Sequence, residues 1–291
     1  MKNLVMSALA IRDKVLGLID DYGENTYGTP YPIFDGRARI VFPDWCVDVA
    51  QRSIRSPKRI EEILFSKSLR TIGSECFSYC ESLRAITVPN GVFMIGALAF
   101  SCCSELQEVT LPEGLKDLLD GTFHHCSKLK TIKIPSSVTK LGYHCFSNCV
   151  SLETIAVPDK VKTLGDGCFT ACIGLNYVSL PEGLEEIGAN VFTQCKSLTA
   201  ITIPYSVTEI GTRCFDGCES LKYIIIPEGV TRIEDATFRD CKSLKNVVLP
   251  NTIQFVNATA FESCNALESM TMPLSMKNKI PLWNSCKINY T

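Results

Sequence analysis

The sequence lacks the features that mark a membrane span, a nucleic-acid partner or a phosphate site. No apolar run approaches the roughly 20 residues that a transmembrane helix needs. The formal net charge is only -2, which leaves no basic surface for nucleic acid or anionic lipid. No glycine-rich phosphate loop or nucleotide-binding motif occurs. We therefore expect no membrane insertion and no nucleic-acid partner.

The N-terminus does not read as a secretion signal. Lys2 is followed by a short apolar stretch that ends at Arg12, and the small-residue triplet at 8–10 lies inside that stretch. A signal peptide needs an apolar region of about 7–15 residues before its cleavage site. Taken alone, the sequence favours a cytoplasmic location.

Histidine is scarce, with three residues, whereas cysteine is abundant, with sixteen. Such a count indicates disulfides in a short secreted chain, and metal binding, catalysis or buried thiols in a long intracellular one. The stretch 134-IPSSVTKLGYHCFSNCVSLETIAVP-158 poses the question, because Cys145 and Cys149 lie four residues apart beside His144. The spacing of cysteine along the whole chain must decide.

That spacing is periodic. Proline recurs at every twenty-third position from Pro89 to Pro273, and phenylalanine keeps the same step from Phe77 to Phe261. A cysteine follows each of these phenylalanines by three positions, and a leucine follows each cysteine by three more. We call the first of these sets the cysteine column: Cys80, Cys103, Cys126, Cys149, Cys172, Cys195, Cys218, Cys241 and Cys264. Four columns that stay in phase over nine turns establish an internal repeat with this step.

The repeat unit is Leu-x-x-Ile-x-Ile-Pro-x-x-Val-x-x-Ile-Gly-x-x-small-Phe-x-x-Cys-x-x. Its alternating start predicts a short strand that proline ends, and Val-x-x-Ile-Gly predicts a second extended piece. The Phe-x-x-Cys phrase predicts a short helix or turn on the return side. A lone coil cannot fold, because ordering its residues costs about 1.5 kcal/mol each, so coils must stack on one another. We expect a positive backbone φ at the glycines of the unit, which are Gly73, Gly96, Gly142, Gly165, Gly188 and Gly211.

The unit resembles the BspA-like leucine-rich repeat family. The stretch 96-GALAFSCCSEL-106 is close to that family's consensus, and the resemblance covers about residues 40–273. It implies an α/β repeat fold, a right-handed leucine-rich-repeat solenoid of about ten coils whose short strands stack into a parallel sheet. It also implies a binding protein without catalytic residues or cofactors, since relatives occur on microbial surfaces and are linked to adhesion to host proteins.

We expect three parts in the chain: an N-terminal capping segment over 1–39, the solenoid over 40–273 and a degenerate C-terminal cap over 274–291. Apolar residues on one helical stripe predict a helix over 4–20. Asp35-Gly36 predicts a hairpin that leads into the first coil. Three residues are expected to cover the last coil: Leu282, Trp283 and Cys286.

The cysteines are best interpreted as structural. Every coil contributes one member to the cysteine column, a position that suits a small buried group able to hydrogen-bond. A second column, with Cys76, Cys145, Cys168 and Cys214, shares its position with alanine and threonine and therefore selects small residues. A four-cysteine zinc site needs tetrahedral convergence, whereas a column sets thiols in a row. Disulfides between neighbouring coils remain an alternative. We expect no catalytic residue, no metal and no cofactor.

The candidate binding surface is the face of the strands that points away from the core. This face is rich in threonine and small residues and has no charge of one sign. Toward its C-terminal end, the repeat brings together Tyr177, Tyr223, Ile225 and Val248. Tyrosine beside exposed aliphatic residues is common in interfaces, and these four are our candidate ligand-binding residues. The alternative is that β-branched and aromatic residues simply favour strands.

Two functions follow from these expectations. The first is a non-catalytic protein-binding leucine-rich-repeat protein of the microbial surface or adhesion type, which recognises a protein or glycoprotein ligand. The resemblance then implies a cell-surface location. The alternative is a structural or scaffolding role inside the cell, which the missing signal and the abundant thiols favour.

Overall fold

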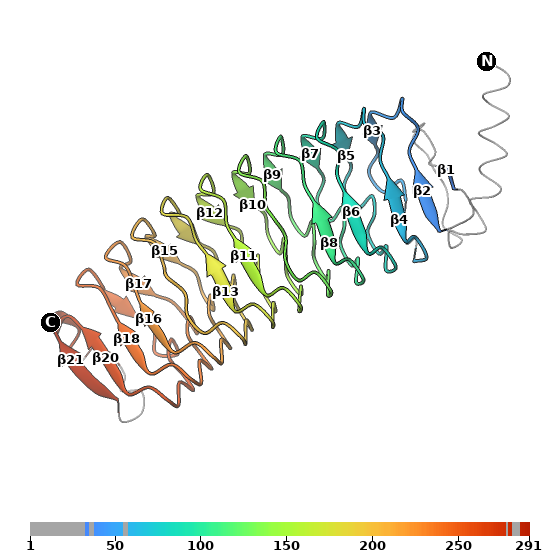
Figure 1. The fold of residues 1–291 in the computed structure, drawn as a ribbon. Coiled ribbons are helices and arrows are strands. Elements are labelled where there is room, and N and C mark those ends of the chain that lie inside the picture. Colours follow the sequence, from blue (N-terminus) through green and yellow to red (C-terminus); the bar gives the residue numbers. More distant parts are fainter. Residues whose placement is uncertain (1–32, 35–37, 55–57, 278, 281–285) are drawn as a thin grey trace, which may run out of the picture.

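The computed structural model describes residues 33–34, 38–54, 58–277, 279–280 and 286–291. These residues form a parallel β-solenoid of about ten coils that runs nearly straight from one end of the molecule to the other (Figure 1). The helix expected over 4–20 and the expected covering residues Leu282 and Trp283 lie outside the described residues. The coil repeat predicted from the sequence is therefore the architecture of the protein.

One set of strands begins each coil and forms what we call the strand face. Its strands pair in parallel with a step of one repeat, so that Tyr223 lies beside Asn246 and Ile225 beside Val248. At the N-terminal end, β1 (Ile33–Phe34) runs antiparallel to β2. The strands of the face are β2 (Arg39–Val41), β4 (Glu62–Leu64), β6 (Ala85–Thr87), β8 (Glu108–Thr110), β11 (Thr154–Ala156), β13 (Tyr177–Ser179), β16 (Tyr223–Ile225), β18 (Asn246–Val248), β20 (Ser269–Met272) and β21 (Lys287–Tyr290).

A second set of two-residue strands confirms the extended Val-x-x-Ile piece. Each of these strands buries its second residue in the core. The strands are β3 (Asp48–Val49), β5 (Thr71–Ile72), β7 (Met94–Ile95), β9 (Asp117–Leu118), β10 (Lys140–Leu141), β12 (Thr163–Leu164), β14 (Glu186–Ile187), β15 (Glu209–Ile210), β17 (Arg232–Ile233) and β19 (Phe255–Val256).

Turns, not helices, form the return side. Among the described residues the one helix is the short 3-10 helix η1 (Leu274–Met276). The Phe-x-x-Cys phrase closes by i to i+3 bonds, as from Cys149 N to Phe146 O at 3.1 Å. Intervening amides donate to the next coil instead, as from Phe146 N to Cys168 O at 2.8 Å. A continuous helix would need those same amides, so pairing between coils replaces it.

The expectation of positive φ at the repeat glycines is wrong. Gly96 and Gly211 have ordinary φ, and their function is to allow a close approach of two coils. A Cβ built on Gly96 would lie 2.3 Å from the backbone nitrogen of Ser74. The left-handed φ values occur instead on the return side, as at Tyr79 (64°) and Asn148 (62°).

Two coils lack the regular opening strand that the repeat predicts. Residues 200–202 form no strand, and the coil at 131–133 keeps a single bridge from Thr131 to Thr154. Their alternation of buried and exposed side chains is nevertheless intact, because Ile132 and Ile201 remain 5% exposed. Burial of the isoleucines, more than the backbone ladder, therefore holds these segments in register.

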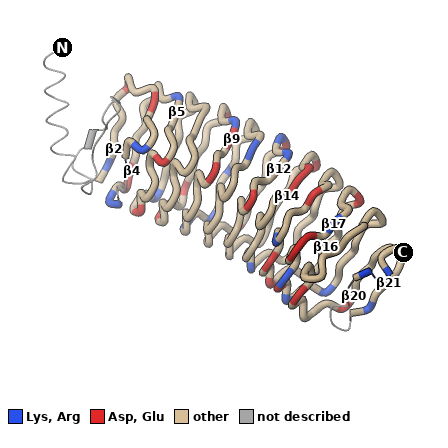
Figure 2. The backbone as a smooth tube through the Cα atoms, turned by 180° about the vertical axis from the view of Figure 1, so that it is seen from behind, with Lys and Arg blue, Asp and Glu red and all other residues tan. Residues whose placement is uncertain are grey.

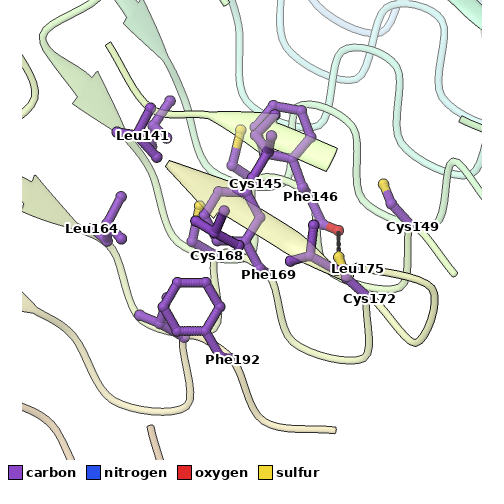
Figure 3. Packing of buried hydrophobic residues seen from close by; sticks show 14 of the residues in the cluster. Leu141, Cys145, Phe146, Cys149, Leu164, Cys168, Phe169, Cys172, Leu175 and Phe192 are labelled. Carbon is purple, nitrogen blue, oxygen red and sulfur yellow. Dashed lines mark hydrogen bonds between the residues drawn. The ribbon is translucent and has the colours of Figure 1, made fainter. Parts of the chain in front are cut away.

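The core is a set of side-chain columns that run along the solenoid. Neighbouring rings of the phenylalanine column stack nearly parallel, with centroids 5.7 Å apart for Phe146 and Phe169 and 5.2 Å apart for Phe238 and Phe261 (Figure 3). All nine rings from Phe77 to Phe261 are at most 1% exposed. Each coil thus buries its apolar side chains against its two neighbours.

Ion pairs join coils on the outside. Lys196 Nζ lies 3.2 Å from Glu219, and Lys242 Nζ contacts the same carboxylate at 3.3 Å. Blue and red segments accordingly lie on adjacent coils along much of the tube in Figure 2. Exposed pairs of this kind contribute about 0–1 kcal/mol each. Other pairs that link residues one repeat apart are Arg39–Glu62, Arg52–Glu75, Lys58–Glu81, Glu105–Lys128, Lys162–Glu185 and Lys245–Glu268.

The last coil is shorter than the others. Ser269 of β20 pairs with Lys287 of β21, whereas Asn246 of β18 pairs with Ser269, so the final step along the chain is less than one full repeat. Cys286, expected to cover the end of the core, lies directly before β21 and packs against the core. The segment after Pro273 therefore adds a strand that the repeat pattern did not predict.

Candidate functional site

The C-terminal half of the strand face carries no charge at neutral pH. Its two outward columns hold residues four and two positions before each repeat proline. In the N-terminal coils these columns contain Glu62, Glu108 and Lys133. The next six coils contain no acidic or basic residue in either column. We call these twelve positions the uncharged face: Thr154, Ala156, Tyr177, Ser179, Ala200, Thr202, Tyr223, Ile225, Asn246, Val248, Ser269 and Thr271.

All four candidate ligand-binding residues lie on this face and point to solvent. Tyr177 is 59% exposed, Tyr223 48%, Ile225 58% and Val248 37%. Ile225 and Val248 are direct neighbours in the register of β16 and β18. Tyr177 and Tyr223 share a column two coils apart, a separation of about 9.6 Å at normal strand spacing. The structure therefore brings the predicted residues onto one contiguous surface.

A hollow of about 340 Å³ lies between the two tyrosines. The coil between them contributes Ala200 and Thr202, so its short side chains form a floor while Tyr177 and Tyr223 form the walls. The alternation of tyrosine, alanine and tyrosine along one column was the sequence signal for this shape, and sequence reasoning missed it. Clefts of this volume fit a large side chain or a small ligand group.

The cysteine column has the geometry of a structural element. Its thiols are fully buried, and eight of them donate to the phenylalanine carbonyl of the preceding coil, as from Cys172 Sγ to Phe146 O at 3.2 Å (Figure 3). Burial raises the pKa of Cys149 to about 12 and raises the pKa values of Cys145 and Cys172 well above that of an ordinary thiol. These thiols therefore stay protonated at neutral pH, whereas a nucleophile or a metal ligand must be a thiolate.

Among the described residues, no disulfide joins any two cysteines, and no group of three or more potential ligands could hold a metal ion. Fourteen cysteines are buried, and Cys102 and Cys286 are partly accessible. The residues of the opening question, Cys145 and Cys149, are both completely buried.

The three histidines form a cluster on the return side that the sequence did not reveal. The His124 ring lies 4.2 Å from that of His125 and 6.4 Å from that of His144. Burial, followed by the charges of His125 and His144, lowers the pKa of His124 to about 4. Its buried Nδ1 has no hydrogen-bond partner in the described part of the chain. His124 therefore stays neutral at physiological pH.

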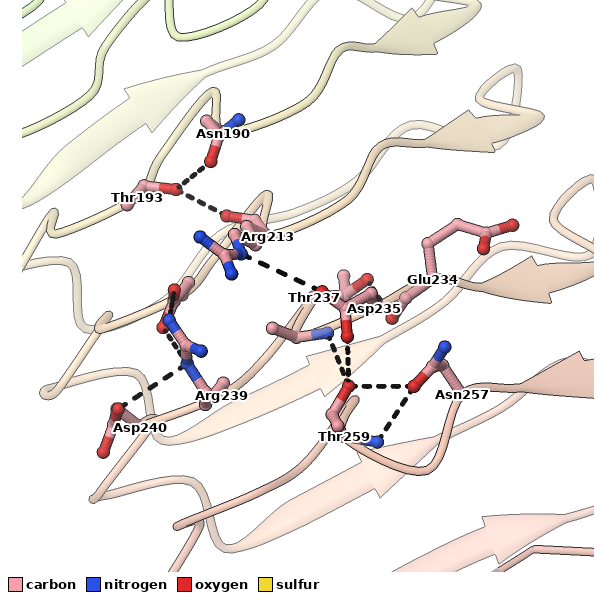
Figure 4. A network of polar contacts seen from close by, with 12 residues as sticks. Asn190, Thr193, Arg213, Glu234, Asp235, Thr237, Arg239, Asp240, Asn257 and Thr259 are labelled. Atoms are coloured by element: carbon pink, nitrogen blue, oxygen red, sulfur yellow. Dashed lines mark hydrogen bonds and ion pairs between the residues drawn. The ribbon is translucent and has the colours of Figure 1, made fainter.

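A polar network occupies the return side of the C-terminal coils (Figure 4). Asp216, whose side chain is 5% exposed, pairs with Arg239 of the next coil, and this guanidinium also reaches Asp240 at 3.8 Å. Thr259 donates to Asp235 at 2.6 Å. Every member has a partner within the protein, so the network joins coils and offers no open binding group.

The chain matches the family model described as BspA type Leucine rich repeat region (6 copies) over residues 51–176 and 162–281. The similarity includes the strand face and the cysteine column. Among curated proteins none matches.

Solved bacterial structures have a similar fold. A leucine-rich repeat protein from Bacteroides ovatus is 27% identical with a TM-score of 0.55, covering 86% of this chain and 76% of that one. The T. pallidum leucine-rich repeat protein TpLRR is 29% identical with a TM-score of 0.52, covering 68% of this chain and 91% of that one. The pneumococcal vaccine antigen PcpA, at 21% identity, a TM-score of 0.59 and coverage of 90% and 77%, shares the fold.

Within the part of the chain that the structure describes, no helix has the length and apolarity to cross a bilayer.

Proposed function

Because the chain belongs to the BspA type leucine-rich repeat family, we propose that it is a non-catalytic binding protein whose uncharged face contacts a protein or glycoprotein ligand. The single observation that carries this proposal is the exposed group of Tyr177, Tyr223, Ile225 and Val248 around a hollow. Tyrosine and apolar residues on a rigid scaffold give large contact areas at low entropic cost.

The absence of charge on this face also supports the proposal. A chain that is 21% charged leaves twelve adjacent outward positions without one acidic or basic residue. Charged residues are depleted at the centres of protein interfaces, because their desolvation is costly. The composition of the uncharged face is therefore that of an interface centre.

We place this binding function at a microbial surface, in an adhesion-type role, on the strength of the family. The thiols favour the alternative of an intracellular scaffold, since fourteen cysteines are buried as thiols and no disulfide is described. Cell fractionation distinguishes the two locations. Surface labelling of the intact cell supports adhesion, and recovery in the cytosol with thiols reduced supports the scaffold.

The binding proposal is tested by a pull-down from a complex protein mixture. The wild type is compared with Tyr177→Ala/Tyr223→Ala/Ile225→Ser and with a control triple variant outside the uncharged face, Leu64→Ser/Thr87→Ala/Thr110→Ala. We expect a partner that the wild type and the control retain and the first variant loses, with all three folded. A partner retained by the first variant would refute the location, and no partner for any of them would refute the function.

A further inference from the structure

The uncharged face is self-complementary, and we propose that the protein partner at this face is a second copy of the chain. The proposal rests on the proposed binding function and names its partner. In such a dimer, two strand faces stack with a two-fold axis that lies between them, parallel to the strands, and passes midway between the coils of Ala200 and Tyr223.

This axis reverses the order of the coils and keeps each outward column opposite itself. Coil by coil, the first of the six then faces the sixth, the second faces the fifth and the third faces the fourth. In the outer column Thr154 therefore faces the partner's Ser269, Tyr177 faces the partner's Asn246 and Ala200 faces the partner's Tyr223. In the inner column Ala156 faces the partner's Thr271, Ser179 faces the partner's Val248 and Thr202 faces the partner's Ile225.

The sizes of the side chains match under this operation. The smallest residue in the centre, Ala200, meets the partner's Tyr223, and the exposed Ile225 meets the partner's Thr202. The hollow between Tyr177 and Tyr223 therefore receives the tyrosine of the other copy. Because the interface is isologous, the same insertion occurs twice. Large side chains thus fill small positions on both copies without any rearrangement of the backbone.

The absence of charge has a specific meaning for self-association. A two-fold axis brings equal surfaces together, so charges near the axis meet charges of the same sign, which weakens association. The N-terminal coils, with Glu62 and Glu108 in the outer column, would suffer this repulsion in a pairing of their own. The six coils of the uncharged face would not.

The shape and the area agree with a dimer of moderate affinity. The solenoid runs nearly straight, so its strand face is flat enough for a second face to pack on it (Figure 1). Sheets that pack in this way lie about 10 Å apart with strands nearly aligned. Six coils at about 4.8 Å and a width of about 17 Å give roughly 500 Å² per copy, or about 1,000 Å² in total. This is the lower limit for a specific interface, so we expect dissociation in the micromolar range.

The test is the molecular mass in solution, measured by sedimentation equilibrium from about 1 to 200 µM, a range that brackets micromolar dissociation. The wild type should pass from 32.1 kDa to twice that mass. Ala200→Arg blocks the hollow and adds a charge on each side of the axis, so we expect dimerisation to weaken at least about 100-fold. The matched control is Ala85→Arg, an exposed alanine in the same column on β6, which should dimerise like the wild type.

The pairing of coils is tested by mixing two single variants. Thr202→Glu and Ile225→Lys should each weaken dimerisation alone, and their mixture should associate more tightly than either, because the two new charges then face each other. A wild type that stays monomeric at all concentrations overturns the proposal, as does a dimer unaffected by Ala200→Arg or a mixture without gain. If the wild type is monomeric while the pull-down partner still depends on Tyr177 and Tyr223, the binding function stands and only the second copy is excluded.

Discussion

The repeat glycines offer a sharp test of how the coils are spaced. A Cβ on Gly211 would lie 2.4 Å from the backbone nitrogen of Ala189, whereas normal contact begins near 3.4 Å. Relief requires the two coils to separate by about 1 Å. The hydrogen bond from Gly211 N to Ile187 O, now 2.8 Å, would then break. Overpacking costs about 1–3 kcal/mol and the lost bond about 1 kcal/mol. We expect Gly211→Ala to lower the free energy of unfolding by about 2–4 kcal/mol.

The matched control is Gly114→Ala. A Cβ there has its nearest neighbour at 3.8 Å, the carbonyl oxygen of Val92. Alanine should therefore be neutral or stabilise by about 0.4–1 kcal/mol through the entropy of the unfolded chain. Urea titrations followed by far-UV circular dichroism give both values. If Gly211→Ala proves as stable as Gly114→Ala, the close approach of the coils does not constrain the sequence.

A third variant separates close approach from backbone conformation. Asparagine tolerates the left-handed region better than alanine does. Gly211→Asn would therefore be the milder change if this glycine needed a positive φ. Because the obstacle is the neighbouring coil, we expect Gly211→Asn to be at least as destabilising as Gly211→Ala. Wild-type stability of Gly211→Asn would contradict the structural explanation.

Three further predictions concern the core and the return side. Phe169→Ala should lose about 3–5 kcal/mol of unfolding free energy, since a fully buried ring leaves a cavity between two stacked neighbours; a loss below about 1 kcal/mol in urea titrations would show that the column can collapse. His124 has a folded pKa of about 4, below its unfolded value near 6.5, so the unfolded chain binds the extra proton and stability falls as pH drops from 6.5 to 4. The loss between pH 7 and pH 5 should be about 2 kcal/mol, and His124→Ser, which copies Ser101 and Ser147 of the adjacent coils, should remove it. In native protein, a thiol reagent should modify Cys102 and Cys286 first and reach the other fourteen cysteines only with unfolding, whereas rapid native modification of all sixteen would refute their burial.

The sequence predicted most of the fold because the repeat carries the information many times over. A phenylalanine in phase nine times identifies a core column even when single coils vary, and the constant step of the repeat places Ile225 beside Val248 without any structure. The candidate binding residues followed from the same register. Periodicity therefore accounts for both the coils and the contiguity of the exposed surface.

What the sequence did not predict depends on contacts between coils. The glycines were interpreted through their own φ, although the constraint comes from the backbone of the preceding coil, as at Gly96. The return side was open between helix and turn, because the spacing of Phe and Cys fits both and only the amide bonds to the next coil distinguish them. Strand β21 escaped prediction because the shorter step from Ser269 to Lys287 breaks the phase.

The ion pairs between coils also number the coils during folding. Since every coil buries the same core columns, a chain that looped out one coil would still place phenylalanine on phenylalanine and cysteine on cysteine. The outer charges would not survive such a slip. Lys196 would meet Lys242 in place of Glu219, and Asp216 would meet Glu262 in place of Arg239. Charges that alternate in sign from coil to coil thus penalise the one misfolded arrangement that the hydrophobic core cannot tell from the native one.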